Sequence, residues 1–230
     1  MQDDTPTPAA AAAAPPALDA IEARILGCLI EKEALTPESY PLTENAIVAA
    51  CNQKTSREPV MHVEPGTIAH ALRAMEGRGL VRFAAASQRA RRYEHRFDAA
   101  YGTTVRQRAV LCVMLLRGPQ TLAELLARSD RLAGFPGLDD VRDTVDRLQQ
   151  RDPALVACIG RSAGQREDRY AHLLCGPVDT AVSAPPPASG PRPEPREALH
   201  QRLDRLEADV QALRDELAAL GRRLEPHRDA

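Results

Sequence analysis

The chain has 230 residues, a formal net charge of −2 at pH 7, 43% apolar residues and 3% aromatic residues. This length accommodates two small domains with appendages, whose cores must be built from Leu, Val, Ile and Ala because Trp is absent. The near-neutral charge gives no argument for overall attraction to nucleic acid or membranes, and the scarcity of aromatic residues argues against base-stacking platforms.

Residues 1–17 are mainly Ala, Pro and Thr, which bury too little apolar surface to offset the entropy of ordering, so we expect a disordered arm. Its acidic start and short alanine run do not match a signal peptide. No stretch approaches the ~20 apolar residues that span a bilayer. We therefore expect a cytoplasmic protein.

The first predicted domain covers residues 18–98 and begins with an amphipathic helix. Apolar residues recur at helical spacing, and charged residues occupy the remaining surface. The apolar set is Ile21, Ile25, Cys28 and Leu29, and the charged set is Glu22, Arg24, Glu31 and Lys32. The helix should end before Thr36-Pro37.

Two further helices and a hairpin should complete this domain. Thr43 can cap a second helix, and Pro65 suits the first turn of a third helix that ends at Gly79. After Gly79 the spacing of apolar residues changes to every second position, which predicts a β-hairpin. Val81 and Phe83 should share one face of its first strand, and Tyr93 and Phe97 should share one face of its second strand. Three helices followed by a hairpin is the order of a winged helix.

Residues 99–176 predict a second winged helix, a repeat of architecture rather than of sequence. Its first helix, from Val105 to Leu116, is apolar almost all round and should be buried on more than one side, as at an inter-domain or inter-subunit contact. Thr121 and Glu124 form a capping box for the next helix, Val141, Val145 and Leu148 mark a third, and a hairpin should follow over 155–159 and 169–174.

The remaining chain predicts a linker and an oligomerisation helix. Residues 177–195 hold seven prolines, typical of a semi-stiff linker. Residues 196–225 carry apolar residues at alternating steps of four and three, which predicts a coiled coil. The charged residues beside the apolar a and d positions, which form the seam of the coiled coil, favour a parallel homodimer. Leucine at both the a and d positions is also compatible with a trimer. The predicted contact residues are Leu199, Leu203, Leu206, Val210, Leu213, Leu217, Leu220 and Leu224.

Positive charge gathers in the first domain. Between Lys54 and Arg96 there are nine basic residues against four acidic ones. A basic third helix and hairpin would favour phosphate contacts, because arginine presents forked donors at fixed geometry. The candidate DNA-binding residues are Lys54, Arg57, Thr67, His70, Arg73, Arg78, Arg89, Arg91 and Arg92. The alternative is a solvated basic face without a partner.

The third helix of the second domain has the opposite character. Its carboxylates outnumber its arginines, so this surface favours a protein partner over DNA. The carboxylates are those of Asp139, Asp140, Asp143, Asp146 and nearby Asp152, against Arg142, Arg147 and Arg151.

We find no pattern for catalysis, cofactor binding or metal binding. The cysteines form no CxxC pair, and we interpret them as buried thiols in a reducing compartment. The histidines are not spaced as metal ligands are, so we interpret them as surface or capping residues. The sequence also lacks a phosphate-binding glycine loop and a nucleophile elbow. These residues are Cys28, Cys51, Cys112, Cys158 and Cys175, with His62, His70, His95 and His172.

The segments EARILGCLIEKEALTPESYPLTENAIVAACNQKTSREPVM (22–61) and PGTIAHALRAMEGRGLV (65–81) resemble the YceH-like family of uncharacterised bacterial proteins. The likeness extends more loosely to about Pro177. It implies tandem winged-helix domains, a mostly α fold with small β-hairpins (α+β), and no established activity.

Two functions remain open from the sequence. The first is a DNA-binding, transcription-regulator-like protein that contacts duplex DNA through the first winged helix and dimerises through its tail. The second is a protein–protein scaffold that uses its winged helices, the second domain above all, without binding DNA. Fold alone does not distinguish them. An enzyme is not expected.

Overall fold

The computed structural model describes residues 16–84, 91–161 and 167–178, together with Gln211. The fold is α+β, with helices and small antiparallel sheets, as predicted. Contacts divide the chain into a unit Met1–Ala184 and a unit Pro185–Ala230, and of the latter only Gln211 is among the described residues. Within the described part, no helix combines the length and apolarity needed to cross a membrane.

The first half of unit Met1–Ala184 has the predicted order of three helices and a hairpin. Asp19 and Glu22 form a capping box at its first helix, Thr43 caps its second helix through the amide of Ala46, and Pro65 opens its third. The elements are α1 (Ala20–Leu35), the 3-10 turn η1 (Pro37–Ser39), β1 (Leu42–Thr43), α2 (Glu44–Cys51), α3 (Pro65–Gly77), β2 (Val81–Phe83), β3 (Arg92–His95) and α4 (Phe97–Tyr101).

The second half repeats this order after α4. Capping boxes at Thr104 and Thr121 begin its first two helices, the second as predicted. The elements are α5 (Val105–Arg117), α6 (Leu122–Ser129), α7 (Leu138–Gln149), β4 (Val156–Gly160) and β5 (Arg169–His172). The predicted hairpin is therefore present, with ends that differ by one or two residues.

The two halves also share a hydrogen-bond pattern. In the first half, β1 pairs with β3, so the sheet order is β1-β3-β2. In the second half, Gln120 precedes α6 as β1 precedes α2, and it exchanges two main-chain hydrogen bonds with Tyr170 of β5 at 2.8 and 2.9 Å. An extended residue before the second helix therefore anchors each hairpin to its helices.

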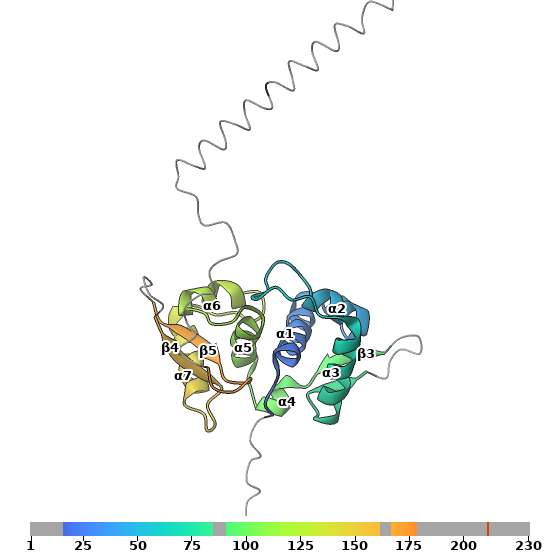
Figure 1. Cartoon of the computed structure of the whole chain (residues 1–230). Helices are drawn as coiled ribbons and strands as arrows, with labels where there is room; N and C mark the ends of the chain where they lie inside the picture. Colours follow the sequence, from blue (N-terminus) through green and yellow to red (C-terminus); the bar gives the residue numbers. More distant parts are fainter. Residues whose placement is uncertain (1–15, 85–90, 162–166, 179–210, 212–230) are drawn as a thin grey trace, which may run out of the picture. The chain divides into compact units, whose positions relative to one another are not determined.

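The halves are joined through α1 and α5, which make the most extensive contact between described elements and lie side by side in Figure 1. Gly27 permits this approach, because a Cβ there would lie 2.8 Å from Leu116 Cδ2. Backbone hydrogen bonds add to the contact, from Leu18 to Leu174 and from Glu58 to Leu116, each 2.8 Å long. The prediction that the helix from Val105 is buried on more than one side is confirmed, since Ala109 to Leu116 are all buried where the two halves meet.

Burial of α1 on several sides corrects the amphipathic pattern expected for it. Arg24 is 2% exposed and Glu22 6% exposed, whereas the helical pattern places both on the surface. The cause is that α1 contacts α2 and α3 as well as α5, so few of its positions remain in water. The core is accordingly one cluster that runs through both halves.

Three other expectations are corrected. Phe97 does not continue the strand after Tyr93, because β3 ends at His95 and Phe97 begins α4, where its ring lies 4.7 Å from that of Tyr101. Cys158 and Cys175 are exposed, whereas Cys28, Cys51 and Cys112 are buried. His172 is largely buried rather than on the surface. His95 is also largely buried, but its Nδ1 accepts from the amide of Phe97 at the start of α4, which is a capping contact as expected.

Several predicted segments lie outside the described residues. They are the arm 1–17 apart from residues 16 and 17, the linker 177–195 apart from residues 177 and 178, and the coiled coil 196–225 apart from Gln211. All eight predicted seam residues, from Leu199 to Leu224, belong to this set, as does Arg89.

Candidate nucleic-acid interface

Helix α3 presents one buried and one exposed side. Ile68, Leu72 and Met75 are fully buried against α1 and α2, because apolar residues recur at three- and four-residue intervals. The opposite side exposes the candidate residues Thr67, His70 and Arg73. The other exposed positions of the helix include the small residues Gly66, Ala74 and Gly77 and the carboxylate of Glu76. The exposed part of α3 therefore combines small residues and hydrogen-bond donors with one acidic side chain.

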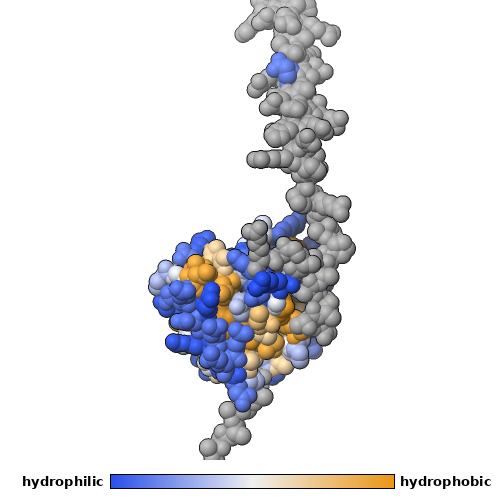
Figure 2. Space-filling model, turned by 90° about the vertical axis from the view of Figure 1, so that its left-hand side faces the viewer, coloured by the Kyte–Doolittle hydropathy of each residue, from blue (hydrophilic) through white to orange (hydrophobic). Residues whose placement is uncertain are grey.

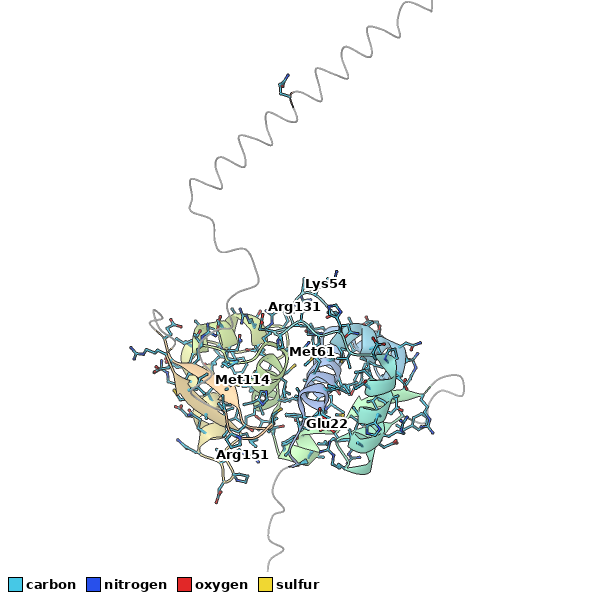
Figure 3. All side chains as sticks on the ribbon, viewed as in Figure 1. Glu22, Lys54, Met61, Met114, Arg131 and Arg151 are labelled. Atoms are coloured by element: carbon cyan, nitrogen blue, oxygen red, sulfur yellow. The ribbon has the colours of Figure 1, made fainter. Side chains whose placement is uncertain are left out.

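Two of the candidate cations, which lie before and after α3 in the chain, have no carboxylate partner in the described ranges. Lys54 is exposed in the loop between α2 and α3, and Figure 3 shows it at the upper edge of the unit. Arg91 is exposed where the described part of the hairpin resumes, with its guanidinium 5.7 Å from the centroid of the Phe83 ring. Like Arg73, neither makes an ion pair with any residue of the described ranges. Their charges are available to an anion.

Arg57 is a correction to the candidate set. Its side chain is 0% exposed and forms a bidentate ion pair with Glu31, whose side chain is 13% exposed. Its Nε also donates to the carbonyl oxygen of Ala50 at 3.1 Å. Burial lowers the pKa of Arg57, but the pairing with Glu31 outweighs this effect and raises it. A charge held in the core in this way cannot contact DNA.

Arg78 and Arg92 are partly committed to contacts within the protein. Arg78 pairs with Glu22 and donates to the carbonyl oxygen of Ala17 at 2.8 Å, so it anchors the start of the described chain. Arg92 donates to the carbonyl oxygen of Pro41 at 2.8 Å and is half-buried. Both are weaker candidates than Arg73 and Arg91, because part of their donor capacity is already used.

A surface pocket of about 610 Å³ lies beside the C-terminal end of α3. Arg78, Arg82 and Arg96 line it together with Glu76. Two of these arginines are neutralised by ion pairs, Arg78 by Glu22 and Arg82 by Glu94 on the neighbouring strand. The pocket therefore holds less free positive charge than its lining residues suggest.

The corresponding helix of the second half, α7, carries four aspartates and two arginines. Val141, Val145 and Leu148 are fully buried, while Asp139 and Asp143 are exposed. Asp140 pairs with Arg106 at 3.3 Å, and Arg142 and Arg147 are exposed. The exposed charges of α7 therefore balance, and its acidic excess lies in the half-buried Asp140 and Asp146. On α3 the exposed charges are Arg73 and Glu76, so the predicted contrast between a basic and an acidic third helix is not present in their exposed residues.

Sequence reasoning missed a polar network that joins the halves. His95 Nε2 lies 2.9 Å from Glu33 Oε2, and Arg108 of α5 pairs with both Glu33 and Asp98. Burial lowers the pKa of His95, although Glu33 opposes the shift. No spacing in the sequence could indicate this network, because its members come from α1, β3, α4 and α5.

The described residues contain no group of three or more His, Cys, Asp or Glu side chains placed to hold a metal ion.

The second polar group that sequence reasoning missed is Arg24, whose guanidinium is buried at the contact of α1 with α2. Its charge predicts a surface position, because charged residues usually lie there. The ionisable side chains that act on the Arg24 guanidinium include those of Cys28, Cys51 and Arg57.

Comparison with known proteins identifies the family. Residues 18–165 match the family described as "Protein of unknown function, DUF480". A UPF0502 protein of Stenotrophomonas maltophilia strain K279a is 52% identical over 208 residues, covering 89% of this chain and 94% of the relative. A UPF0502 protein of Xanthomonas oryzae pv. oryzae strain MAFF 311018 is 53% identical over 216 residues, covering 91% and 95%.

A third relative comes from a different bacterial genus. A UPF0502 protein of Mesorhizobium japonicum is 51% identical over 207 residues, covering 90% of this chain and 97% of the relative. These alignments extend over most of both chains, so the resemblance noted in the sequence is confirmed. The chain belongs to the DUF480 (UPF0502) family of bacterial proteins of unknown function.

Proposed function

We propose that this protein is a non-enzymatic, DNA-binding, transcription-regulator-like protein whose two halves are winged helices. In each half three helices precede an antiparallel hairpin, and an extended residue before the second helix pairs with the second hairpin strand. In helix-turn-helix proteins the recognition helix enters the major groove. By its place in this order, α3 is the recognition helix of the first half.

The exposed side of α3 is the observation that carries the proposal. Arg73 and Thr67 can donate hydrogen bonds to base edges, and arginine is the side chain most often bonded to guanine in the major groove. The small residues Gly66 and Ala74 leave room for the helix to approach a groove. His70 lies between these positions on the same exposed side.

Lys54 and Arg91 would supply the phosphate contacts that orient the helix on DNA. Both are exposed, and they belong to the loop before α3 and to the hairpin after it. If Lys54, Arg73 and Arg91 each neutralise one phosphate, the log–log dependence of affinity on salt has a slope of about −2.7. Homodimerisation through the predicted coiled coil would add avidity.

The test is a fluorescence anisotropy titration of random duplex DNA with the full chain, at about 50 mM and about 200 mM salt. DNA binding predicts saturable binding that weakens by more than tenfold between these conditions. Absence of binding at the lower salt concentration would refute the proposal.

A protein–protein scaffold is the second candidate, and the excess of aspartate over arginine on α7 favours it. Asp139 and Asp143 would repel DNA phosphates but suit a basic protein surface. Figure 2, which shows the face formed by the second half, reveals apolar surface bordered by hydrophilic surface. Such a border is typical of protein contact sites. This candidate replaces the first if DNA is not bound.

A further inference from the structure

Two cysteine thiols meet in the core of the first half. Cys28 lies in the middle of α1 and Cys51 is the last residue of α2, and both are 0% exposed. The two thiols are close enough in this core for the ionisation of each to depend on the other. The sequence gives no sign of this pairing, since the two residues are far apart in the chain and belong to no CxxC motif.

Two buried guanidinium groups lie against these thiols. Arg24 is one helical turn before Cys28, and it donates from Nη1 to the carbonyl oxygen of Cys51 at 3.2 Å and from Nη2 to that of Pro59 at 2.7 Å. Arg57 forms its ion pair with Glu31, and its positive charge acts on both thiols. The thiol pair is therefore bordered by two positive charges.

The charges of this cluster do not balance if both thiols are neutral. Glu31 compensates Arg57 through its bidentate pair, whereas Arg24 makes no ion pair with a carboxylate in the described chain. The Nε atom of Arg24 is buried and has no hydrogen-bond partner there either. An uncompensated buried cation is strongly unfavourable, so an anion is expected beside Arg24. A thiolate would supply it.

The surroundings favour ionisation of Cys28 over Cys51. Burial alone raises the pKa of the Cys28 thiol, but its interaction with Cys51 and the charge of Arg57 together bring it below its ordinary value. The interaction with Cys28, together with burial, raises the pKa of Cys51. The other charged groups around the pair are Glu31 on α1 and Glu58 in the following loop, and Cys112 faces it from α5.

We propose that Cys28 and Cys51 form a peroxide-reactive dithiol, in which Cys28 is a thiolate held as the counter-ion of Arg24 and Arg57, and Cys51 is the resolving thiol. This site does not depend on DNA binding. It assigns a chemical role to two residues that sequence patterns alone classify as inert core thiols.

The reaction consumes one molecule of hydrogen peroxide as the oxidant. The Cys28 thiolate attacks a peroxide oxygen, so that an S–O bond forms, the O–O bond breaks, and the released hydroxide takes up a proton to become water. Cys51 then attacks the sulfur of the resulting sulfenic acid, the S–O bond breaks, and the thiol proton leaves with the hydroxyl group as a second water. The product is a disulfide between α1 and α2.

Cys112 is a matched control within the same core. It is fully buried, its Sγ donates to the carbonyl oxygen of Gly27 at 3.4 Å, and burial raises its pKa well above the ordinary value. Because Cys28, Cys51 and Cys112 are all inaccessible in the folded core, peroxide must reach each by transient opening. A difference in their reactivity therefore reports ionisation and pairing rather than exposure.

The experiment uses the full chain with the exposed thiols removed by Cys158→Ser and Cys175→Ser. Reduced protein is treated with hydrogen peroxide, quenched with N-ethylmaleimide under denaturing conditions, and digested with trypsin, which separates Cys28 from Cys51 by cleaving after Lys32. We expect a Cys28–Cys51 crosslinked peptide to form at least about tenfold faster than Cys112 is oxidised. Oxidation of Cys28 and Cys51 no faster than Cys112, or without a crosslink, would overturn the proposal.

Two further variants assign the roles of the thiols. Cys51→Ser keeps a hydrogen-bond donor beside Cys28, so peroxide should leave a sulfenic acid at Cys28 that dimedone traps. Cys28→Ser should protect Cys51 from oxidation. Equal oxidation of Cys51 with and without Cys28 would contradict the assignment of Cys28 as the attacking group.

A measurement without peroxide tests the ionisation itself. In the Cys158→Ser, Cys175→Ser background, native protein at pH 7 should show thiolate absorbance near 240 nm equivalent to about one group per chain. Adding Cys28→Ser should abolish it, whereas adding Cys112→Ser should leave it unchanged. Absence of this absorbance from the native background protein would refute the thiolate, even where an individual variant fails to fold.

Discussion

Arg57 and Glu31 form a bidentate ion pair in the core of the first half, with Nη1 donating to Oε1 at 3.0 Å and Nη2 to Oε2 at 2.6 Å. Replacing Glu31 with Gln leaves the Arg57 charge buried without its carboxylate. We expect the free energy of unfolding to fall by about 3–5 kcal/mol. Urea denaturation measures this loss. The control is Glu38→Gln on the exposed turn η1, with an expected change within about 0.5 kcal/mol; similar losses in both variants would contradict the prediction.

The contact between α1 and α5 predicts opposite effects for two glycine substitutions. In Gly27→Ala the new Cβ would meet Leu116 at 2.8 Å, and such overpacking costs about 1–3 kcal/mol. In Gly66→Ala on α3 the new Cβ would meet nothing within 4 Å, so the better helix propensity of alanine should stabilise by up to about 1 kcal/mol. Denaturation midpoints compare them. Stabilisation by Gly27→Ala would show that the two helices can separate without cost.

His172 should make stability depend on pH in the acidic range. Burial lowers its pKa from 6.5 to about 4, so below pH 6.5 the unfolded chain binds a proton that the folded chain does not. The stabilisation is fully present above pH 6.5 and falls as pH decreases toward 4, by up to about 3 kcal/mol. Burial of His95 acts in the same direction.

The comparison of His172→Gln with wild type isolates this contribution. Denaturation at pH 4.5 and pH 7 should show a smaller acid-induced loss of stability in the variant. His70→Gln, at an exposed position of α3, is the control and should keep the wild-type dependence. A parallel pH profile for His172→Gln and wild type would show that the histidine is protonated equally in both states.

Arg73 and Arg91 should account for much of the DNA affinity if the proposed interface is correct. Changing both to Ala removes about two phosphate-neutralising charges, so the log–log salt slope should shrink by about 1.8. Arg142→Ala with Arg147→Ala, on the acidic helix α7, removes the same charge and is the matched control. Equal losses in the two double variants would indicate a response to net charge rather than a contact site.

The Arg91→Ala and Arg92→Ala pair gives a second comparison. Because Arg92 is half-buried and donates to the carbonyl oxygen of Pro41, its replacement should also lower stability slightly. Thermal unfolding measured beside DNA affinity separates these effects. Arg91→Ala alone should reduce affinity without changing the midpoint of unfolding.

The heptad pattern of the tail predicts its oligomeric state. Leu213→Asp places a charge in the predicted seam and should cost several kcal/mol, giving monomers. Ala212→Asp adds the same charge one position outside the seam and should leave the oligomer intact. Analytical ultracentrifugation of the full chain distinguishes the two. An unchanged mass for Leu213→Asp would place the subunit contact outside the tail.

The sequence by itself determined the order of the main helices and the two hairpins in the described chain, except for α4, and several of the helix starts. Helix starts at Thr43, Pro65 and Thr121 were predictable because capping depends on residues within one turn. The exposed sides of α3 and α7 followed from apolar periodicity, which is equally local. The excess of aspartate over arginine on α7 likewise follows from the order of residues alone.

The tertiary structure alone decided what α1 packs against, and with it the fate of its charged residues. Helical periodicity assigns one side of a helix to the core, but α1 is covered by α2 and α3 and also by α5, which lies far along the chain. This coverage buries Arg24, and Arg57 enters the same core from the loop after α2. The pairing of Cys28 with Cys51 depends on how two helices pack, and neighbouring residues in the sequence do not encode that geometry.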